Sequence, residues 1–344
     1  MSRILVTGSA GFIGFHVARA LLAEGHQVIG LDSHNDYYDP RLKADREAIL
    51  LAMPGYEAVR GKVEEPGLLH GVFERHRPEG VVHLAAQAGV RHSIKNPRAY
   101  VEANLLGGFE LLEAARAFPP RHLMMASTSS VYGANTKMPY AETDKTEAPL
   151  SFYAATKKSN EVMAHSYAHL FDLPITMFRF FTVFGPWGRP DMAPHLFTDA
   201  ILNDRPIKVF NHGDMRRDFT YIDDLVAGIL ALLPHPPSVA LPEGDSLSPV
   251  APWRSINIGN GEPVKLMDFI AALETAIGSD ARKQMMPMQP GDVSATWADD
   301  TLITRLTGGV PKTPLPDAVQ AYVTWFRGYF ECALSPAESP AAGE

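Results

Sequence analysis

The segment Tyr153-Ala-Ala-Thr-Lys157 holds a phenol and an ammonium group four residues apart, a spacing that places both on one face of a helix. Among the eleven tyrosines, Tyr153 is the one with a lysine at this distance. A nearby ammonium lowers the pKa of a phenol, so that the tyrosinate can accept the proton of an alcohol. An ordinary solvated surface pair has the same spacing. The pair therefore indicates acid/base chemistry on a hydroxyl group only if the fold encloses it.

A run of hydroxyl side chains, Ser127-Thr128-Ser129-Ser130, directly follows the apolar stretch His122–Ala126. If that stretch is a strand of a parallel sheet, its carboxyl end lies where such sheets bind ligands. The alternative is a turn whose hydroxyls bond only to its own backbone. The position of the run favours the first interpretation, in which the hydroxyls contact a polar ligand.

A glycine-rich turn, Gly8-Ser-Ala-Gly11-Phe-Ile-Gly14, separates the apolar run Ile4–Val6 from a segment with helical periodicity. A Cβ atom in such a turn would hold a pyrophosphate away from the backbone N–H groups, and the next helix presents its positive N-terminus to the same phosphates. The commoner spacing is Gly-x-Gly-x-x-Gly, and a glycine triplet alone also fits a plain tight turn. The order of strand, turn and helix favours dinucleotide binding.

Asp32 closes the second apolar run, Gln27–Leu31, at the point where the second strand is expected to end. A carboxylate at this point can accept both ribose hydroxyls of an adenosine, and it repels the 2′-phosphate of NADP. The sequence therefore predicts NAD as the cofactor.

Strand-like and helical segments alternate along the first half of the chain, which is typical of a doubly wound parallel sheet of the Rossmann type. The expected strands are Ile4–Val6, Val28–Leu31, Val81–Leu84, His122–Ala126 and Ile175–Phe181. The expected helices include Arg41–Leu51, Tyr100–Ala117 and Tyr153–Leu170, the second with Val101, Leu105, Phe109, Leu112 and Ala115 on one face. Asp32 and the hydroxyl run then stand at strand ends, and the last of these helices carries Tyr153 and Lys157.

The texture of the sequence changes after Gly185, where several prolines interrupt the periodicity and short helices and strands follow. We expect a smaller C-terminal α/β lobe for the substrate to begin there. The expected division is an NAD-binding domain over 1–185 with returning segments near 215–260, a discontinuous substrate lobe over 186–330, and a flexible tail over 335–344.

The 344 residues include 46% apolar and 20% charged side chains, the proportions of an ordinary globular enzyme. A formal charge of −8 with scattered Lys and Arg argues against nucleic-acid binding. The single cysteine, Cys332, allows no internal disulfide, and no apolar run approaches membrane-spanning length, so we expect a cytoplasmic protein. His165 and His169 have a metal-compatible spacing without a further ligand, so no metal site is expected.

Longer motifs carry a resemblance that extends from Ser2 to about Phe330. They are His83-Leu-Ala-Ala-Gln-Ala-Gly-Val-Arg91, Asn135-Thr-Lys-Met-Pro139, Tyr153-Ala-Ala-Thr-Lys157, Arg179-Phe-Phe-Thr-Val-Phe-Gly-Pro-Trp-Gly-Arg-Pro-Asp191 and Met215-Arg-Arg-Asp-Phe-Thr-Tyr-Ile-Asp-Asp224. With these motifs the chain resembles the extended short-chain dehydrogenases/reductases and, within them, the UDP-glucuronate 4-epimerases. The pieces that begin at Asn135 and Arg179 are similar to this subfamily rather than to the superfamily as a whole.

The resemblance implies a role for each residue of the candidate site. Tyr153 is the implied acid/base, Lys157 lowers its pKa, and Thr128 bonds the sugar O4. The residues implied in NAD binding are Gly8, Gly11, Phe12, Ile13, Gly14, Asp32, Val63, Ala85, Ala86, Gln87, Asn104, Tyr153 and Lys157. The residues implied in binding the UDP-sugar are Ser129, Ser130, Thr182, Arg189, Arg217 and Asp292. Among these, Thr182 and Arg189 form the implied clamp for the sugar carboxylate, since a hydroxyl and a guanidinium suit that group.

Two positions depart from the pattern of the relatives. Lys62 stands where relatives carry an adenine-binding Asp, so that contact falls to the backbone of Val63. Gln289 stands near the place of a phosphate-binding Arg, so neutralisation of the diphosphate rests more on Arg217.

The implied reaction is reversible inversion at C4 of UDP-glucuronate to give UDP-galacturonate, through a transient 4-keto sugar and with NAD tightly held. A UDP-glucuronate decarboxylase shares the first half-reaction, but Thr182 with Arg189 argues against it. A non-catalytic NAD(H)-binding sensor is a second alternative, against which the intact Thr128, Tyr153 and Lys157 argue. The resemblance also implies a homodimer that pairs through two long helices.

Overall fold

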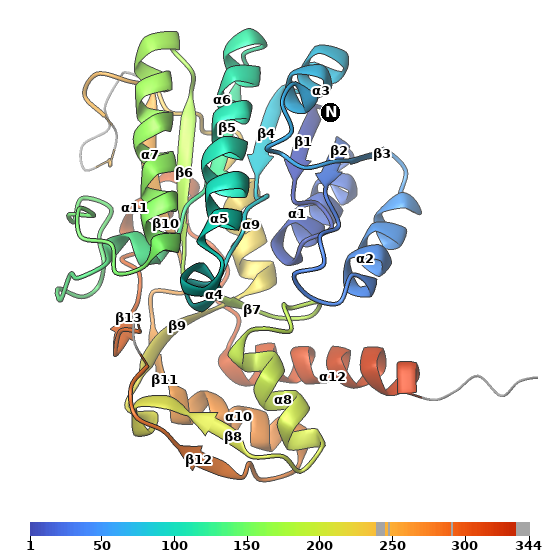
Figure 1. Cartoon of the computed structure of the whole chain (residues 1–344), viewed down its shortest axis with the longest axis vertical. Helices are drawn as coiled ribbons and strands as arrows, with labels where there is room; N and C mark the ends of the chain where they lie inside the picture. Colours follow the sequence, from blue (N-terminus) through green and yellow to red (C-terminus); the bar gives the residue numbers. More distant parts are fainter. Residues whose placement is uncertain (239–244, 247, 290–291, 335–344) are drawn as a thin grey trace, which may run out of the picture.

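Seven strands form the central sheet of the structure, a computed structural model that describes residues 1–238, 245–246, 248–289 and 292–334 (Figure 1). From one edge to the other they are β10 (Trp253–Ile258), β6 (Ile175–Phe180), β5 (His122–Ala126), β4 (Gly80–His83), β1 (Arg3–Thr7), β2 (Gln27–Asp32) and β3 (Tyr56–Arg60). Every neighbouring pair is parallel, and the strand order reverses between β1 and β4. The predicted doubly wound parallel sheet is confirmed.

Two layers of helices cover the sheet, because its strands are apolar on both faces and must be buried on both. One layer consists of α1 (Phe12–Ala23), α2 (Arg41–Leu51), α9 (Ile222–Leu232) and α11 (Thr301–Thr307). The other consists of α3 (Leu68–His76), α6 (Gly107–Ala117) and α7 (Phe152–Phe171). Each layer encloses its own hydrophobic core against the sheet.

The predicted helix over Tyr100–Ala117 consists of three pieces in the structure. They are α5 (Pro97–Tyr100), a π-helical turn η1 (Val101–Leu106), and α6, and they follow the short helix α4 (Val90–Lys95). The predicted buried face is wrong in part, since Phe109 is 45% exposed. The helix instead turns glycines inward, because a Cβ on Gly108 would lie 2.5 Å from Asn160 Oδ1 of α7. Close packing of α6 against α7 therefore decides which residues face the core.

Elements of the central layers that the sequence analysis did not predict include β3 and α3. The edge strand β3 is largely exposed and has no apolar run, and α3 follows it after a short loop. Pairing with β2 determines the strand at this position, since local pattern alone gives no signal for it.

A smaller lobe lies beyond one end of the central sheet (Figure 1). Its sheets join β11 (Pro263–Lys265), β9 (Arg216–Tyr221), β13 (Ala295–Thr296) and β7 (Thr182–Phe184), and separately β12 (Lys283–Met285) and β8 (Ile207–Val209). Its helices are α8 (Ala193–Leu202), the 3₁₀ turn η3 (Phe210–Gly213), α10 (Leu266–Ile277) and α12 (Leu315–Leu334). A third hydrophobic core holds them together, with Phe219 and Phe269 stacked at 4.1 Å. Between β9 and β11 the chain returns to the central layers, where it forms α9 and β10.

Within the described ranges, no helix is both long enough and apolar enough to cross a membrane. The predicted flexible tail over 335–344 lies outside the described residues.

Candidate active site

A cleft of about 620 Å³ opens where the strand order of the sheet reverses, at the carboxyl ends of β1, β2, β4, β5 and β6. The predicted site residues that line it are Gly8, Gly11, Phe12, Ile13, Gly14, Asp32, Val63, Ala85, Ala86, Gln87, Thr128, Tyr153, Lys157 and Arg189. The predicted residues that do not line it, although the structure describes them, are Asn104, Ser129, Ser130, Thr182, Arg217 and Asp292. One cleft thus unites the glycine turn with the acid/base pair.

The glycine turn is shaped by close approaches within the protein itself. Gly8 has a φ of +72°, and a Cβ there would lie 2.8 Å from Ala85 N. A Cβ on Gly14 would lie 2.0 Å from Gly8 O, so α1 can sit on the turn only with glycine at this position. Gly11 is the N-cap of α1, and no side chain caps the helix there, although Gly11 N itself donates to Gly8 O at 2.9 Å. The backbone N–H groups of the first turn, which begins at Phe12, can therefore bind an anion such as the pyrophosphate of a dinucleotide.

Asp32 ends β2 and is almost fully buried. Its carboxylate accepts hydrogen bonds from Ala10 N at 3.1 Å, His34 N at 2.8 Å and Lys43 Nζ at 3.1 Å. The oxygens keep lone pairs for ribose hydroxyls, so the position fits the adenosine end of NAD. Lys43 was missed by the sequence analysis, and its ammonium offsets the charge of Asp32. Repulsion of a 2′-phosphate is therefore weaker than the bare carboxylate predicts.

Asn104 supports the cleft from behind, which corrects its predicted place on the wall. Its Oδ1 accepts from Gln87 N at 2.8 Å, and its Nδ2 donates to Gln87 O at 3.1 Å and to Thr156 Oγ1 at 3.0 Å. The π-helical turn η1 aims this amide at the loop after β4. Asn104 therefore fastens the loop Ala85–Gln87 to α7.

Tyr153 stands in the first turn of α7, which starts where Ser151 Oγ accepts from Ala154 N at 3.1 Å. The phenol shares the cleft with Thr128, and its ring meets Tyr100 edge-on at 6.0 Å between centroids. Burial raises the pKa of Tyr153 above its ordinary value, whereas the Thr128 hydrogen bond and the charge of Arg189 lower it. Two neighbours thus favour the phenolate in an otherwise apolar setting.

Lys157 lies one helical turn further along α7 and is only 2% exposed. Its Nζ donates to Ala126 O at 2.8 Å, and burial lowers its pKa to about 8. The sequence analysis gave Lys157 the role of lowering the pKa of Tyr153. That role stays a prediction. In the structure the ammonium bonds to the backbone of β5, and Thr128 and Arg189 are groups that lower the pKa of Tyr153.

Arg189 enters the cleft from the loop after β7, but its guanidinium already has a partner. Nε donates to Asp191 Oδ1 at 3.0 Å and a terminal nitrogen donates to Oδ2 at 2.6 Å. The Tyr37 hydroxyl donates to the same Oδ2 at 3.0 Å, across the mouth of the cleft. Burial works to raise the pKa of Asp191, but pairing with Arg189 holds it below its ordinary value. Asp191 and Tyr37 have no pattern in the sequence that links them to Arg189.

Arg217 and Asp292 lie together in the smaller lobe. Arg217 donates to Val293 O at 2.7 Å and to Ser294 O at 3.2 Å, beside Asp292. Asp292 in turn faces Arg91, with 3.9 Å between nitrogen and oxygen. These residues form a charged group apart from the lining of the cleft.

The remaining hydroxyls and the two helical histidines have local partners. Ser130 N donates to Thr128 Oγ1 at 3.2 Å, so the hydroxyl run also bonds its own backbone. His165 bonds Ser248 Oγ at 2.8 Å and His169 bonds Val250 O at 2.8 Å. Across the described part of the chain, no three His, Cys, Asp or Glu side chains converge as a metal site requires.

Comparison with known proteins gives matches along almost the whole chain. The sequence model of the NAD dependent epimerase/dehydratase family matches residues 4–245. A probable UDP-glucuronate 4-epimerase of Rhizobium meliloti is 53% identical over 329 residues, which covers 94% of this chain and 96% of that protein. UDP-glucuronate 4-epimerase 4 of Arabidopsis thaliana is 46% identical over 332 residues, which covers 95% of this chain and 76% of that protein.

A solved structure shares the fold as well. UDP-glucuronic acid 4-epimerase of Bacillus cereus, in complex with UDP-glucuronic acid and NAD, aligns with a TM-score of 0.85 at 34% identity, over 95% of this chain and 99% of that one. The chain belongs to the NAD dependent epimerase/dehydratase family.

Proposed function

We propose that the protein interconverts UDP-glucuronate and UDP-galacturonate by inversion at C4, with NAD held throughout. The observation that carries this proposal is the meeting of Tyr153, Thr128 and Arg189 in the cleft that also holds the glycine turn and Asp32. A proton acceptor, a hydroxyl and a guanidinium are the groups that a sugar alcohol next to a carboxylate requires. Relatives over the whole chain that are named UDP-glucuronate 4-epimerases add support.

Tyr153 is the proposed acid and base for the O4 proton. NAD, held by the glycine turn and Asp32, would supply the acceptor for the hydride of C4 and the donor for its return. Thr128 orients O4 toward the phenol, and it favours the phenolate through its hydrogen bond. Lys157 fixes the end of β5 through the Ala126 carbonyl and provides a buried positive charge near the phenolate. Inversion requires that the 4-keto sugar turn about its link to the diphosphate and present its other face before the hydride returns, after which the same phenol gives its proton back to O4.

Arg189 is the proposed binding group for the sugar carboxylate. The 4-keto intermediate is a β-keto acid, and it loses CO₂ readily when the bond to the carboxylate aligns with the carbonyl π system. A bidentate guanidinium can hold the carboxylate plane so that this alignment is avoided. Thr182, Ser129 and Ser130 are proposed as additional sugar contacts, made when the smaller lobe closes on the substrate. Arg217 and Asp292 are proposed to bind the diphosphate and the uridine ribose, respectively.

We also propose the division of labour that the sequence indicates, with NAD bound by 1–185 and the returning segments near 215–260, and the UDP-sugar bound mainly by 186–330. Strand β10 belongs to the central sheet, although it follows β7, β8 and β9 of the smaller lobe along the chain. This order supports a discontinuous arrangement of the two parts.

The test is proton NMR of the purified protein with UDP-glucuronate and no added cofactor. A UDP-galacturonate signal that grows to an equilibrium ratio supports the proposal. A UDP-pentose with release of CO₂ identifies a decarboxylase instead. Absence of any reaction, with NAD shown to be bound by its absorbance after denaturation, favours a non-catalytic NAD(H)-binding protein.

A homodimer in the cytoplasm is the proposed working state. Large apolar side chains are exposed along η1, α6 and α7, which lie side by side on one face of the molecule (Figure 1). They are Val101, Leu106, Phe109, Phe152, Val162, Leu170 and Phe171. A patch of this kind is typical of a protein interface. Light scattering should give twice the chain mass, and Phe109→Glu should give a monomer; a monomeric unmodified protein contradicts the proposal.

A further inference from the structure

Three residues of α7 lie against three consecutive residues at and just after the end of β5. Tyr153 lines the same cleft as Thr128, whose hydroxyl lowers the pKa of the phenol, and Lys157 Nζ donates to Ala126 O at 2.8 Å. One turn further on, Glu161 Oε1 accepts from Ser127 Oγ at 2.7 Å. The first two contacts belong to the proposed acid/base site. The third has no assigned role, although it holds the residue next to Thr128.

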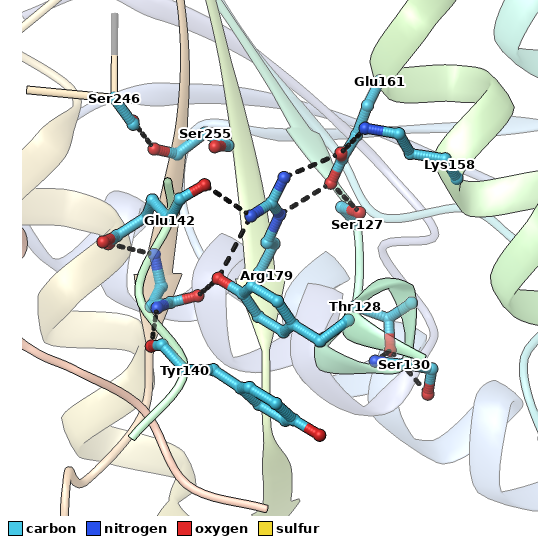
Figure 2. Close-up of polar contacts among 12 residues, drawn as sticks. Ser127, Thr128, Ser130, Tyr140, Glu142, Lys158, Glu161, Arg179, Ser246 and Ser255 are labelled. Atoms are coloured by element: carbon cyan, nitrogen blue, oxygen red, sulfur yellow. Dashed lines mark hydrogen bonds and ion pairs between the residues drawn. The ribbon is translucent and has the colours of Figure 1, made fainter. Parts of the chain in front are cut away.

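Glu161 is 1% exposed and its carboxylate is surrounded by donors. Besides Ser127, it accepts from Arg179 Nε and a terminal nitrogen, both at 2.9 Å, and from Lys158 Nζ at 3.2 Å (Figure 2). Arg179, on β6, is 3% exposed. Burial of two charges costs several kcal/mol per ion, and apolar residues of similar volume are often as stable, so stability gives little reason for this pair.

The side of the Arg179 guanidinium that does not contact Glu161 bonds to Tyr132, two residues after the hydroxyl run Ser127–Ser130. Its second terminal nitrogen donates to the Tyr132 hydroxyl at 3.1 Å and to Glu142 O at 3.0 Å. Tyr132 ends the 3₁₀ turn η2 (Ser129–Tyr132), which starts directly after Thr128. Figure 2 shows the Arg179 guanidinium between Glu161 and Glu142, with Thr128 and Ser130 to one side. One ion pair therefore bonds both Ser127, which precedes Thr128, and Tyr132, the last residue of η2.

We propose that the Glu161–Arg179 pair is a positioning unit, which fixes the turn Thr128–Ser130 against Tyr153 without contacting the substrate. The inference rests on the proposed function for the identity of the reaction, but its geometric part concerns this chain alone. Displacement of a reacting group by about 1 Å costs on the order of 100-fold in rate. A turn with both ends fixed to α7 and β6 keeps Thr128 at a constant distance from the phenol.

Ser127→Ala is the test variant, because it removes the link to Glu161 and leaves the buried ion pair intact. Glu161→Gln is the second variant, and the double variant measures the coupling between the two residues. Tyr167→Phe is the matched control: it removes one hydrogen bond of α7, to Glu113 Oε1 at 2.6 Å, at the opposite end of the helix. The four variants and the unmodified protein are prepared with NAD bound, and rates are expressed per bound NAD.

Two readouts separate positioning from folding. In Ser127→Ala we expect kcat for UDP-glucuronate to fall about 10-fold, with KM within about 2-fold of the unmodified protein. The pKa of Tyr153, followed by NMR of tyrosines labelled at Cζ and assigned with Tyr153→Phe, should rise relative to the control, because Thr128 no longer holds the phenol. The loss of kcat in the double variant, expressed as a free energy, should be less than the sum of the losses in the two single variants.

The proposal is overturned if Ser127→Ala matches Tyr167→Phe in kcat and leaves the pKa of Tyr153 unchanged. If the unmodified protein does not turn over UDP-glucuronate, the proposed function fails. The Tyr153 titration needs no substrate, so it still decides the positioning role in that case.

Discussion

The two sides of the cleft differ in how their charged and polar groups are held. On the α7 and β5 side, Lys157 and Glu161 are at most 2% exposed and have partners within the central layers. On the side of the loops and the smaller lobe, the side chains of Arg189 and Asp191 are 20% and 32% exposed, and they pair with each other. The first side fixes in advance the groups that we propose for proton transfer. The second side holds internal partners that the carboxylate of the proposed substrate would replace.

Tyr153→Phe tests the fixed side with the largest expected effect. Removal of the phenolic oxygen takes away the proposed proton acceptor, so kcat should fall by about 10³-fold or more, within the range for general acid–base groups. NAD content should stay the same, because the ring still packs against Tyr100. Steady-state rates and cofactor content check this result, with Tyr167→Phe as the control. A loss of less than about 10-fold would assign the proton to another group.

Lys157→Met separates activity from stability on the same side. We expect kcat to fall by about 100-fold, whereas Tm should rise by roughly 2–4 °C, since a buried ammonium is replaced by an apolar chain of similar length. Lys208→Met, at an exposed position on β8, is the control for loss of a charge. Thermal unfolding and rates measured on the same samples decide the outcome.

The stability gain of Lys157→Met has a predictable pH dependence. Burial lowers the pKa of Lys157 from 10.5 to about 8, so the unfolded chain binds this proton more tightly than the folded one. The cost of the buried ammonium is fully present below pH 8, and it disappears as pH rises from about 8 to 10.5. The Tm difference between the variant and the unmodified protein should therefore shrink over this range. A constant difference would show that the ammonium is not the cause.

Arg189→Ala tests the side of the cleft that is formed by the loops and the smaller lobe. Loss of a charge-assisted bidentate contact should raise KM for UDP-glucuronate roughly 10- to 100-fold. Some UDP-pentose should appear, because the keto acid is then free to lose CO₂. Arg205→Ala removes an exposed arginine of the lobe and serves as the control. An unchanged KM with pure epimer as product would remove Arg189 from the carboxylate site.

Asp191→Asn should give the smallest effect, and in the opposite direction. The variant keeps an acceptor for Tyr37 but removes the carboxylate that competes for Arg189. We expect KM to fall about 2- to 5-fold, which corresponds to 1 kcal/mol or less. A rise in KM would mean that Asp191 orients Arg189 for the substrate, and the two sides of the cleft would then be equally fixed.

Local patterns in the sequence were sufficient for the fixed side. The strand over His122–Ala126 and the helix that carries Tyr153 follow from apolar periodicity, and the glycine turn follows from spacing. The stripe Tyr153, Lys157 and Glu161 is also visible as a four-residue repeat. The role of Glu161 in this stripe depends on its pairing with Arg179 of β6, and a single sequence does not place Arg179 beside Glu161.

Contacts between distant segments account for what the sequence did not predict. Lys43 reaches Asp32 from a helix that has the composition of an ordinary charged surface. Asp191 joins Tyr37 across the cleft, from a different part of the chain. The π-helical turn that aims Asn104 also depends on packing, since its residues have the pattern of a continuous α-helix. Pairings of this kind appear only once the sheet order is known.

The most direct measurement of the central claim uses UDP-glucuronate that carries deuterium at C4. If one enclosed site removes and returns the same hydrogen while Tyr153 manages the proton, the UDP-galacturonate formed in ordinary water should keep its deuterium at C4, as read by proton NMR and mass spectrometry. Loss of the deuterium to solvent, or its transfer to C5, would contradict the account.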